Sequence, residues 1–210
     1  MKKALITFVK APVPGTVKTR LQPDLPPEKI VRVYKSFVTG ILSVCSGLKG
    51  VERFLGCTPT KDDAYLKRLS VKYGMQRFNQ RGKTLGERIF NAFRDCAEKG
   101  YTDIVLIGSD SPSIPLDFIK KAFAELRKND LVVGPCFDQG LYLIGVKREK
   151  INELSRKIKL DTGKDINGIL RKSNSLNVRF TMLPFWYDID NIDDLEFLKS
   201  HLTYLKRLAI

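Results

Sequence analysis

Residues 103–112 of this 210-residue chain read D-I-V-L-I-G-S-D-S-P, and this stretch decides the fold. Its first part, Asp103–Gly108, is an almost uninterrupted apolar run, typical of a central strand in a parallel sheet that is covered on both faces. Asp110 follows the run directly, and Pro112 and Pro115 delay the start of the next helix. Ligands of open α/β sheets bind beyond the carboxyl ends of the strands. We therefore expect the Asp110 carboxylate to project into a binding cleft.

Strand-like and helix-like segments alternate on both sides of this central run. Further strands are predicted over Ala4–Val9, Val51–Cys57, Asp130–Cys136, Leu141–Val146 and Val178–Leu183. Helices are predicted over Pro27–Leu48, Asp63–Tyr73, Thr84–Gly100, Leu116–Lys128, Lys164–Lys172 and Ile192–Leu208. This alternation predicts a three-layer α/β/α fold with a mostly parallel sheet. No repeat or linker interrupts it, so we expect one domain over residues 1–210.

The charge of the chain is strongly basic, with 37 Lys and Arg against 23 Asp and Glu, a net charge of +14. Two regions run the other way: residues 101–146 hold 4 basic and 6 acidic side chains, and residues 173–210 hold 4 and 5. The basic excess therefore lies mainly on the predicted helices elsewhere. No basic run is interleaved with aromatic residues, as in a groove that tracks a nucleic-acid backbone. We expect no nucleic-acid partner.

The numbers and positions of cysteine and histidine argue against two kinds of functional site. Cys45, Cys57, Cys96 and Cys136 stand singly, which excludes a zinc site of ordinary C-x-x-C spacing and is typical of buried thiols in a reducing compartment. His201 is the only histidine, so imidazole acid–base catalysis is not expected. The hydrophobic content of 43% includes no run long enough for a membrane span, and the N-terminus does not resemble a signal peptide. We expect a soluble, cytoplasmic protein.

Two familiar nucleotide-binding motifs are absent. No G-x-G-x-x-G follows the first predicted strand. The tetrapeptide R-G-K-T at 81–84 lacks the glycine that a P-loop requires five residues before Gly82, where Arg77 stands. Thr84 and Glu87 instead match a capping box and predict the start of a helix.

The loop after the first strand reads K-A-P-V-P-G-T-V-K-T-R over residues 10–20 and carries Lys10, Pro12, Gly15, Lys18 and Arg20. Lysine offers a compact positive charge and arginine a bidentate fork, so the loop can wrap a polyphosphate. A plain surface loop with solvated cations has the same composition. The motif alone leaves both interpretations open.

Carboxylates follow other predicted strands and suggest a metal. Mg²⁺ is usually held by one or two carboxylates together with substrate phosphates. Asp110 is one candidate, although an aspartate in this position also satisfies turn amides. Asp188 and Asp190 point the same way if their segment is extended, and either can complete a site with Asp110. Asp193 and Asp194 are expected to favour the N-terminus of the closing helix instead.

Taken in order, five segments resemble the glycosyltransferase A-type fold family of nucleotidyl- and glycosyltransferases. They are F-V-K-A-P-V-P-G-T-V-K-T-R-L, L-G-E-R, I-G-S-D-S-P, G-P-C-F-D-Q-G-L-Y-L-I-G and D-I-D-N-I-D-D-L, between Phe8 and Leu195. The chain is most similar to uncharacterised bacterial transferases found beside radical-SAM proteins. It also resembles the guanylyltransferases that act on 2-phospholactate or the molybdenum cofactor. The resemblance implies that Lys18 and Arg20 neutralise nucleotide phosphates and that Asp110 holds Mg²⁺ or Mn²⁺ with Asp190 or Asp188.

The resemblance also assigns residues to the substrate. Asp138 and Gly140 are implied to line the acceptor or nucleotide side of the cleft. Arg88 is expected either to approach the phosphates or to form an ion pair with Glu87 or another neighbour. The nucleotide- and substrate-binding candidates are Lys10, Pro12, Gly15, Lys18, Arg20, Ser109, Asp138, Gln139 and Gly140.

One position departs from the family pattern, which is D-G-G-Y-Y where this chain has D-Q-G-L-Y from Asp138. If that first glycine has a positive φ in relatives, Gln139 must adopt a strained or altered turn, and its side chain would enter space where a ligand approaches. The leading hypothesis is a metal-dependent transferase that uses a nucleoside triphosphate or a nucleoside diphosphate sugar. A nucleotide-binding protein with impaired catalysis is the alternative, and a nucleic-acid-binding module ranks last. The oligomeric state is open, and Trp186 and the closing helix are expected to face the core.

Overall fold

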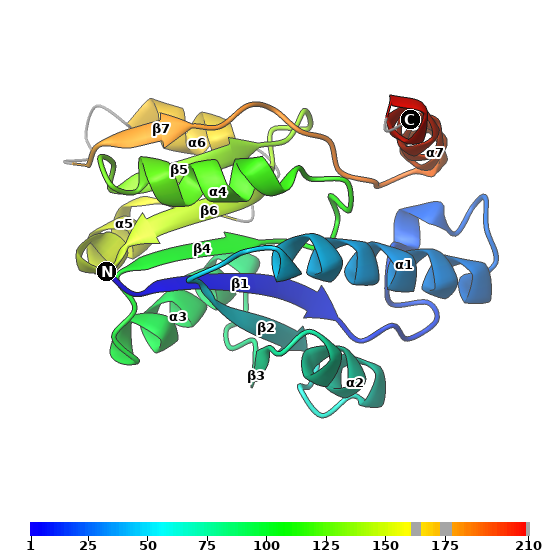
Figure 1. The fold of residues 1–210 in the computed structure, drawn as a ribbon, viewed down its shortest axis with the longest axis horizontal. Coiled ribbons are helices and arrows are strands. Elements are labelled where there is room, and N and C mark those ends of the chain that lie inside the picture. The colour runs from blue at the N-terminus through cyan, green and yellow to red at the C-terminus, as the bar shows by residue number, and fades with distance from the viewer. Residues whose placement is uncertain (161–164, 173–177, 209–210) are drawn as a thin grey trace.

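The computed structural model describes residues 1–160, 165–172 and 178–208. Within these residues seven strands form one sheet in the order β3-β2-β1-β4-β6-β5-β7 (Figure 1). The strands are β1 (Lys3–Lys10), β2 (Glu52–Thr58), β3 (Gln76–Asn79), β4 (Asp103–Ile107), β5 (Leu131–Pro135), β6 (Leu141–Lys147) and β7 (Phe180–Met182). The α-helices are α1 (Pro27–Ser46), α2 (Ala64–Lys72), α3 (Leu85–Glu98), α4 (Leu116–Glu125), α5 (Ile151–Lys157), α6 (Asp165–Lys172) and α7 (Ile192–Leu208). Two 3-10 turns, η1 (Thr19–Leu21) and η2 (Arg148–Lys150), complete them.

The sheet is mostly parallel and has its switch point beside β1. β1 pairs in parallel with β2 on one side and with β4 on the other. The chain therefore leaves β1 in one direction toward β3 and later returns to the opposite side at β4. β6 is antiparallel to both β4 and β5, with Ile107 opposite Leu143, so β6 starts at the edge where β4 ends. The carboxyl ends of β1 and β4 and the beginning of β6 meet at one edge of the sheet.

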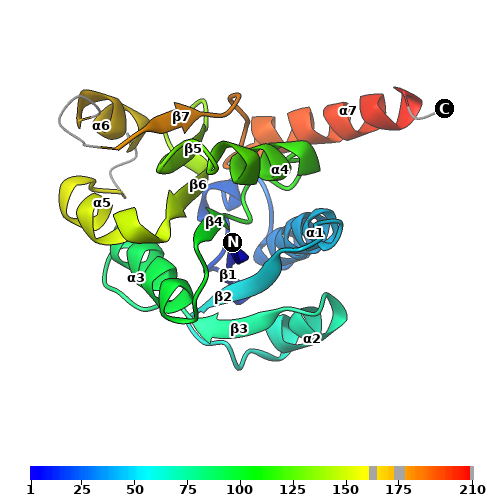
Figure 2. The ribbon, with the colours of Figure 1, turned by 60° about the vertical axis from the view of Figure 1, so that its left-hand side comes forward.

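Helices cover both faces, as the alternating pattern predicts. α1, α2 and α4 pack on one face around Leu5, Val105 and neighbouring buried side chains. α3, α5 and α6 cover the other face, which contains Ile6 and Ile104. Figure 2 shows these two helical layers on opposite sides of the strands. All five residues of β4 are buried, which confirms the central strand that the sequence predicts from Asp103 onward.

Most predicted elements are present, and two present elements were not predicted. β3 is a four-residue edge strand with no buried residue, and α5 has only two buried side chains, so neither carries a clear apolar pattern. The helix expected over 164–172 begins at Asp165, and Lys164 lies outside the described residues. The predicted helix start at Thr84 is confirmed, with the N-cap half of the capping box: Thr84 Oγ1 accepts from the Glu87 amide at 3.2 Å. The Glu87 carboxylate in turn accepts from the Lys83 amide at 2.7 Å.

The closing helix α7 packs against α1 through a small apolar cluster of Phe37, Ile189, Leu195 and Leu198. Figures 1 and 2 show α7 beside α1, with its far end extending from the body of the fold. Trp186, which precedes α7, is partly buried against the larger core, and its indole N–H donates to Ser113 Oγ at 3.2 Å. All four cysteines are buried and free, as expected. None of the described helices has the length and apolarity needed to cross a membrane.

Candidate active site

A cavity of about 440 Å³ opens at the sheet edge where β1 and β4 end. It extends across the strand ends from the β3 side to the start of β6. Its polar lining comes from Lys10, Thr16, Lys18, Thr19, Arg20, Tyr34, Thr58, Gln80, Arg88, Ser109, Asp110 and Asp190. Five predicted site residues from the first loop and the β4 exit thus face one cavity: Lys10, Lys18, Arg20, Ser109 and Asp110.

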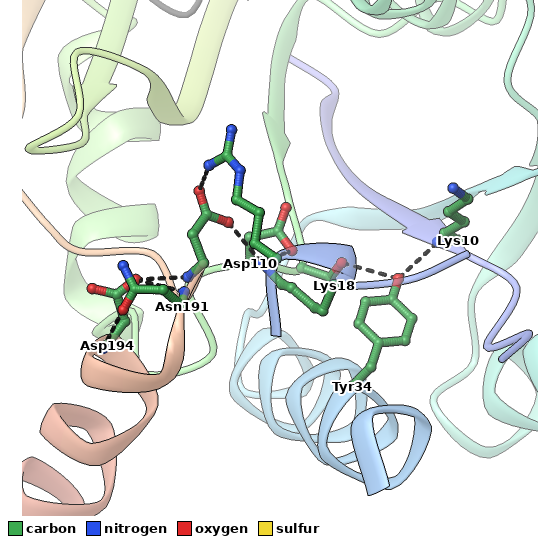
Figure 3. A network of polar contacts seen from close by, with 9 residues as sticks. Lys10, Lys18, Tyr34, Asp110, Asn191 and Asp194 are labelled. Atoms are coloured by element: carbon green, nitrogen blue, oxygen red, sulfur yellow. Dashed lines mark hydrogen bonds and ion pairs between the residues drawn. The ribbon is translucent and has the colours of Figure 1, made fainter. Parts of the chain in front are cut away.

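The centre of the site is an ion-pair network around Lys18. The Lys18 Nζ lies 2.7 Å from Oδ1 of Asp110 and 3.3 Å from Oδ1 of Asp190. The Arg20 guanidinium binds the other oxygen of Asp190 at 2.5 Å. Figure 3 shows Lys18 and Asp110 of this network close together, beside the segment that contains Asn191. The structure therefore brings together Lys18, Arg20, Asp110 and Asp190.

Lys18 is held in an unusual state. Its side chain is only 6% exposed, whereas that of Asp110 is 54% exposed. Burial, the largest effect, acts to lower the pKa of Lys18, but the ion pairs with Asp110 and Asp190 outweigh it and the pKa is raised. The backbone of Lys18 has φ 45°, in the left-handed region that residues other than glycine rarely adopt. A buried, permanently charged ammonium on a strained backbone is typical of a functional position.

Backbone contacts place Asp190 beside Asp110. The Ile189 amide donates to the Asp110 carbonyl at 3.0 Å, which connects the two segments directly. The Asp194 carboxylate accepts from the amides of Asp190 at 2.8 Å and Asn191 at 3.0 Å. The Asn191 side chain accepts from the Asp194 amide at 3.0 Å, so the start of α7 is capped reciprocally (Figure 3). The predicted role of Asp194 at this helix start is confirmed, and the cap orients the preceding Asp190.

Tyr34 on α1 is a site residue that the sequence did not reveal. Its hydroxyl accepts from the Lys10 amide at 2.8 Å and lies 3.2 Å from Ser109 Oγ. It thereby connects the ends of β1 and β4 beneath the cavity (Figure 3). Burial raises the pKa of Tyr34 to about 12, so the phenol stays neutral and available for both hydrogen bonds. The available signal was a hydroxyl-bearing aromatic residue within the helix predicted over 27–48.

On the β3 side of the cavity, the polar side chains Gln80 and Arg88 donate to backbone carbonyls. The Gln80 side-chain amide donates to the carbonyls of Gly56 at 2.8 Å and Val9 at 3.3 Å. Arg88 lines the cavity, and its Nε donates to the Gly82 carbonyl at 3.0 Å. Among the described contacts Arg88 forms no ion pair with Glu87, which instead caps α3. Gln80 was missed because it follows β3, the strand without an apolar pattern.

The connection between β5 and β6 lies beside the cavity lining, not within it. Gln139 has φ 73°, so of the two expected alternatives, a strained or an altered turn, the strained left-handed backbone is present. Its Oε1 accepts from Asn167 Nδ2 at 2.5 Å, and its carbonyl accepts from the Ile166 amide at 3.2 Å. The Gln139 side chain is thus directed to α6 and does not line the cavity. Asp138 accepts from the Gly140 amide at 2.8 Å within the turn.

Three further predicted site residues, Asp188, Pro12 and Gly15, lie outside the cavity lining. Asp188 lies with Cys136 and Asp138, with one ligand atom of each within 4.8 Å of the others. Burial, followed by repulsion from Asp138 and Asp190, raises the pKa of Asp188 to about 6. Pro12 and Gly15 shape the loop before Lys18 without lining the cavity. Gly15 has φ 77°, a conformation that suits glycine at this turn.

Comparisons with known proteins place these features in a wider group. Residues 41–162, more than half of the chain, match a family described as "Uncharacterized protein conserved in bacteria (DUF2064)". No curated protein matches the sequence. A solved structure of a proposed nucleotide-diphospho-sugar transferase from Desulfovibrio desulfuricans G20 is 29% identical, with a TM-score of 0.84 over 94% of this chain and 86% of that one.

Two more distant structures share the fold. A CMP:2-keto-3-deoxy-manno-octonic acid synthetase complexed with CTP is 11% identical, with a TM-score of 0.61 over 96% of this chain and 99% of that chain. A Mycobacterium tuberculosis H37Rv protein in complex with manganese is 17% identical, with a TM-score of 0.52 over 93% and 97% of the two chains. At these identities the likeness concerns the fold.

Proposed function

The chain belongs to the DUF2064 family and has the fold of nucleotide-diphospho-sugar transferases, and from its site we propose that it is a metal-dependent transferase. Its donor substrate is a nucleoside triphosphate or a nucleoside diphosphate sugar, from which it transfers a nucleotidyl or glycosyl group to a small acceptor. One observation carries this proposal: a buried lysine bridges two carboxylates at the mouth of a cavity at the sheet's switch point.

Phosphate recognition rests on Lys18 and Arg20. Both cations face the cavity, and both are held on carboxylates that are only partly buried. A polyphosphate entering the cavity offers them stronger acceptors, with a bidentate partner for the Arg20 guanidinium. The two side chains then exchange carboxylate contacts for phosphate contacts, which frees Asp110 and Asp190.

The residues present fit a divalent metal. The Lys18 ammonium acts as a stand-in cation, because its position shows that Asp110 and Asp190 lie close enough to share one positive charge. Carboxylate oxygens are hard ligands that suit Mg²⁺ or Mn²⁺, and the Mycobacterium tuberculosis protein with this fold was crystallised with manganese. Asp190 is preferred over Asp188 as the second ligand, since Asp190 shares the Lys18 contact. When bound, the ion would neutralise phosphate charge and orient the donor.

The reaction needs positioning and charge stabilisation more than a protein base. With a triphosphate, the α–β phosphoanhydride bond breaks and pyrophosphate leaves. With a diphosphate sugar, the bond from the anomeric carbon to phosphate oxygen breaks and a nucleoside diphosphate leaves. In both cases Lys18 and Arg20 would stabilise the leaving diphosphate, while Tyr34 fixes the strand ends that carry Lys10 and Ser109. Asp138 and Gly140 are proposed to face the acceptor, since their turn leads directly into Leu141, which lines the cavity at the start of β6.

Equilibrium binding of labelled nucleotides tests the proposal. The panel contains each nucleoside triphosphate and each common nucleoside diphosphate sugar, with Mg²⁺, with Mn²⁺ and with neither. We expect one donor class to bind and to require metal for full affinity. Arg20→Gln should weaken that binding roughly 10-fold or more through loss of a charge-assisted contact.

A matched control distinguishes the loss of a cation in the cavity from the loss of positive charge elsewhere on the protein. Arg32 is an exposed arginine on α1, so Arg32→Gln removes the same charge outside the cavity and should bind the donor as the unaltered chain does. If no member of either donor class binds in either metal, the transferase proposal fails.

A nucleotide-binding protein with impaired turnover is a second candidate, favoured by the left-handed Gln139 and its contact with Asn167. Glutamine here replaces the first glycine of the family pattern, in the turn that we propose faces the acceptor. Under this alternative, Gln139→Gly raises a weak transferase activity while donor binding stays the same. A folded Gln139→Gly variant with unchanged turnover would count against impairment by this residue.

A further inference from the structure

Three potential metal ligands converge at the carboxyl end of β5, outside the Lys18 network. They are Cys136, Asp138 and Asp188, and one ligand atom of each lies within 4.8 Å of the other two. Two chain segments that are distant in sequence supply them. A parallel bridge between Cys136 and Trp186, with the Trp186 amide donating to the Pro135 carbonyl at 3.1 Å, holds these segments together.

The members of this cluster have few polar partners among the described residues. Cys136 is 2% exposed, and no described group accepts or donates a hydrogen bond at its Sγ. Asp188 forms no ion pair with a described lysine or arginine, because Lys18 and Arg20 are engaged by Asp110 and Asp190. Asp138 uses one oxygen on the Gly140 amide, which leaves the other available. A buried thiol thus lies beside two carboxylates, neither of which forms an ion pair with a described lysine or arginine, in a chain of net charge +14.

We propose that Cys136, Asp138 and Asp188 bind a divalent cation of borderline softness, such as Zn²⁺ or Co²⁺, at a site separate from the Mg²⁺ or Mn²⁺ position on Asp110 and Asp190. A thiolate ligand selects Zn²⁺ and Co²⁺ over Mg²⁺, which prefers oxygen. Three protein ligands leave the fourth tetrahedral position open for water or a substrate atom. This site goes beyond the proposed function, because nucleotide binding does not require it.

The three ligand atoms need to move only slightly closer together to bind one ion. Ligand bonds of about 2.3 Å to sulfur and 2.0 Å to oxygen place tetrahedral ligand atoms roughly 3.3–3.5 Å apart. Asp138 is exposed and lies in a turn, so its side chain can rotate toward the buried Cys136. Binding converts the Cys136 thiol into a thiolate and releases one proton to solvent. The bound ion would then connect the β5–β6 turn to the segment that precedes α7.

Titration of the reduced, metal-free protein with Co²⁺ tests this proposal. A cobalt–thiolate bond gives a charge-transfer absorption in the near ultraviolet, which an all-oxygen site does not give. We expect this band to saturate at one Co²⁺ per chain, to disappear when one equivalent of Zn²⁺ is added, and to persist in excess Mg²⁺. Cys136→Ser should lose the band, whereas Cys96→Ser, a buried cysteine in α3, should keep it.

A second variant, at the exposed Asp138, tests the site without altering a buried residue. Asp138→Asn retains the oxygen that accepts from Gly140 and should weaken Co²⁺ binding by about 10- to 100-fold. Asp110→Asn should leave the band unchanged, which separates this site from the proposed function. The inference is overturned if the unaltered protein gives no thiolate band with Co²⁺, whether or not Co²⁺ binds, or if the band survives Cys136→Ser. Co²⁺ binding that lacks the band and depends on Asp110 would overturn this inference alone and support the proposed function.

Discussion

The Nζ of Lys18 lies 2.7 Å from Oδ1 of Asp110 and simultaneously contacts Asp190. A single ammonium therefore connects the first loop, the exit of β4 and the segment before α7. All three side chains line the cavity, and the contact shows where a cation is stable. We propose that this internal cation is exchanged for an external one when phosphates bind.

Lys18→Met removes the ammonium and keeps an unbranched apolar chain in the buried position. We expect donor affinity to fall roughly 10- to 150-fold, the value of a hydrogen bond to a charged group. Mn²⁺ alone should bind more tightly, because the ammonium no longer competes for Asp110 and Asp190. Calorimetric titrations of nucleotide and of Mn²⁺ measure both effects. Lys120→Met, on the exposed side of α4, is the control, and equal donor affinity in both variants would contradict the role of Lys18.

Tyr34→Phe leaves the Lys10 amide without its partner at 2.8 Å. The loss of this part-buried hydrogen bond should cost about 1 kcal/mol of unfolding free energy, and the loosened strand ends should weaken donor binding. Tyr65→Phe is the matched control: the Tyr65 hydroxyl donates to the Lys35 carbonyl at 3.0 Å, away from the cavity. Denaturant unfolding and nucleotide titration of both variants provide the measurements. Equal donor affinity in the two variants would remove Tyr34 from the positioning role.

Gln139→Gly and Gln139→Ala separate the backbone of the turn from its side-chain contact. Both variants lose the hydrogen bond to Asn167, so their difference reports the φ of 73°. We expect the glycine variant to be more stable than the alanine variant by about 1 kcal/mol, because only glycine adopts this conformation without strain. Thermal unfolding of the two variants decides this. A more stable alanine variant would show that the turn relaxes to a negative φ.

Asp188→Asn tests the raised pKa of this carboxyl group. Because the pKa of Asp188 is about 6 in the folded protein and about 3.9 in an unfolded chain, the folded state binds its proton more readily. The resulting stabilisation is complete below about pH 4 and is lost as pH rises through 6. In chelator, Asp188→Asn should therefore be more stable than the unaltered chain at pH 7.5, by an amount on the order of 1 kcal/mol after solvent screening. A gain that is equally large at pH 4 would contradict this origin.

The main layers of the fold and much of the proposed phosphate site follow from local patterns. The run before Gly108 is buried as a central strand, and the alternation places Lys18 and Asp110 at adjacent strand ends. The sequence also predicted Asp188 or Asp190 as the partner of Asp110, and it is Asp190 that reaches this point, beside the cap at Asp194. These positions were predictable because each is tied to the end of an element with a strong apolar pattern.

Other features depend on tertiary contacts that no local pattern encodes. Tyr34 acts on Lys10 and Ser109 from another element. Gln80 follows an edge strand with no buried residue. Asp188 and Asp190 share a segment, yet Asp190 contacts Lys18 whereas Asp188 lies with Cys136 and Asp138. Their separation is set by the packing of that segment between β4 and β5.

The most direct test of the account is thermal unfolding with the donor nucleotide and Mn²⁺, compared between the unaltered chain and Asp110→Asn. At about 100 times the dissociation constant, the ligand should stabilise the unaltered chain by about 2.7 kcal/mol, or roughly 5–10 °C in Tm. Asp110→Asn should lose the metal-dependent part of this shift. Asp117→Asn, an exposed acid on α4, should retain it. A full metal-dependent shift in Asp110→Asn would contradict the proposal that Asp110 binds the metal.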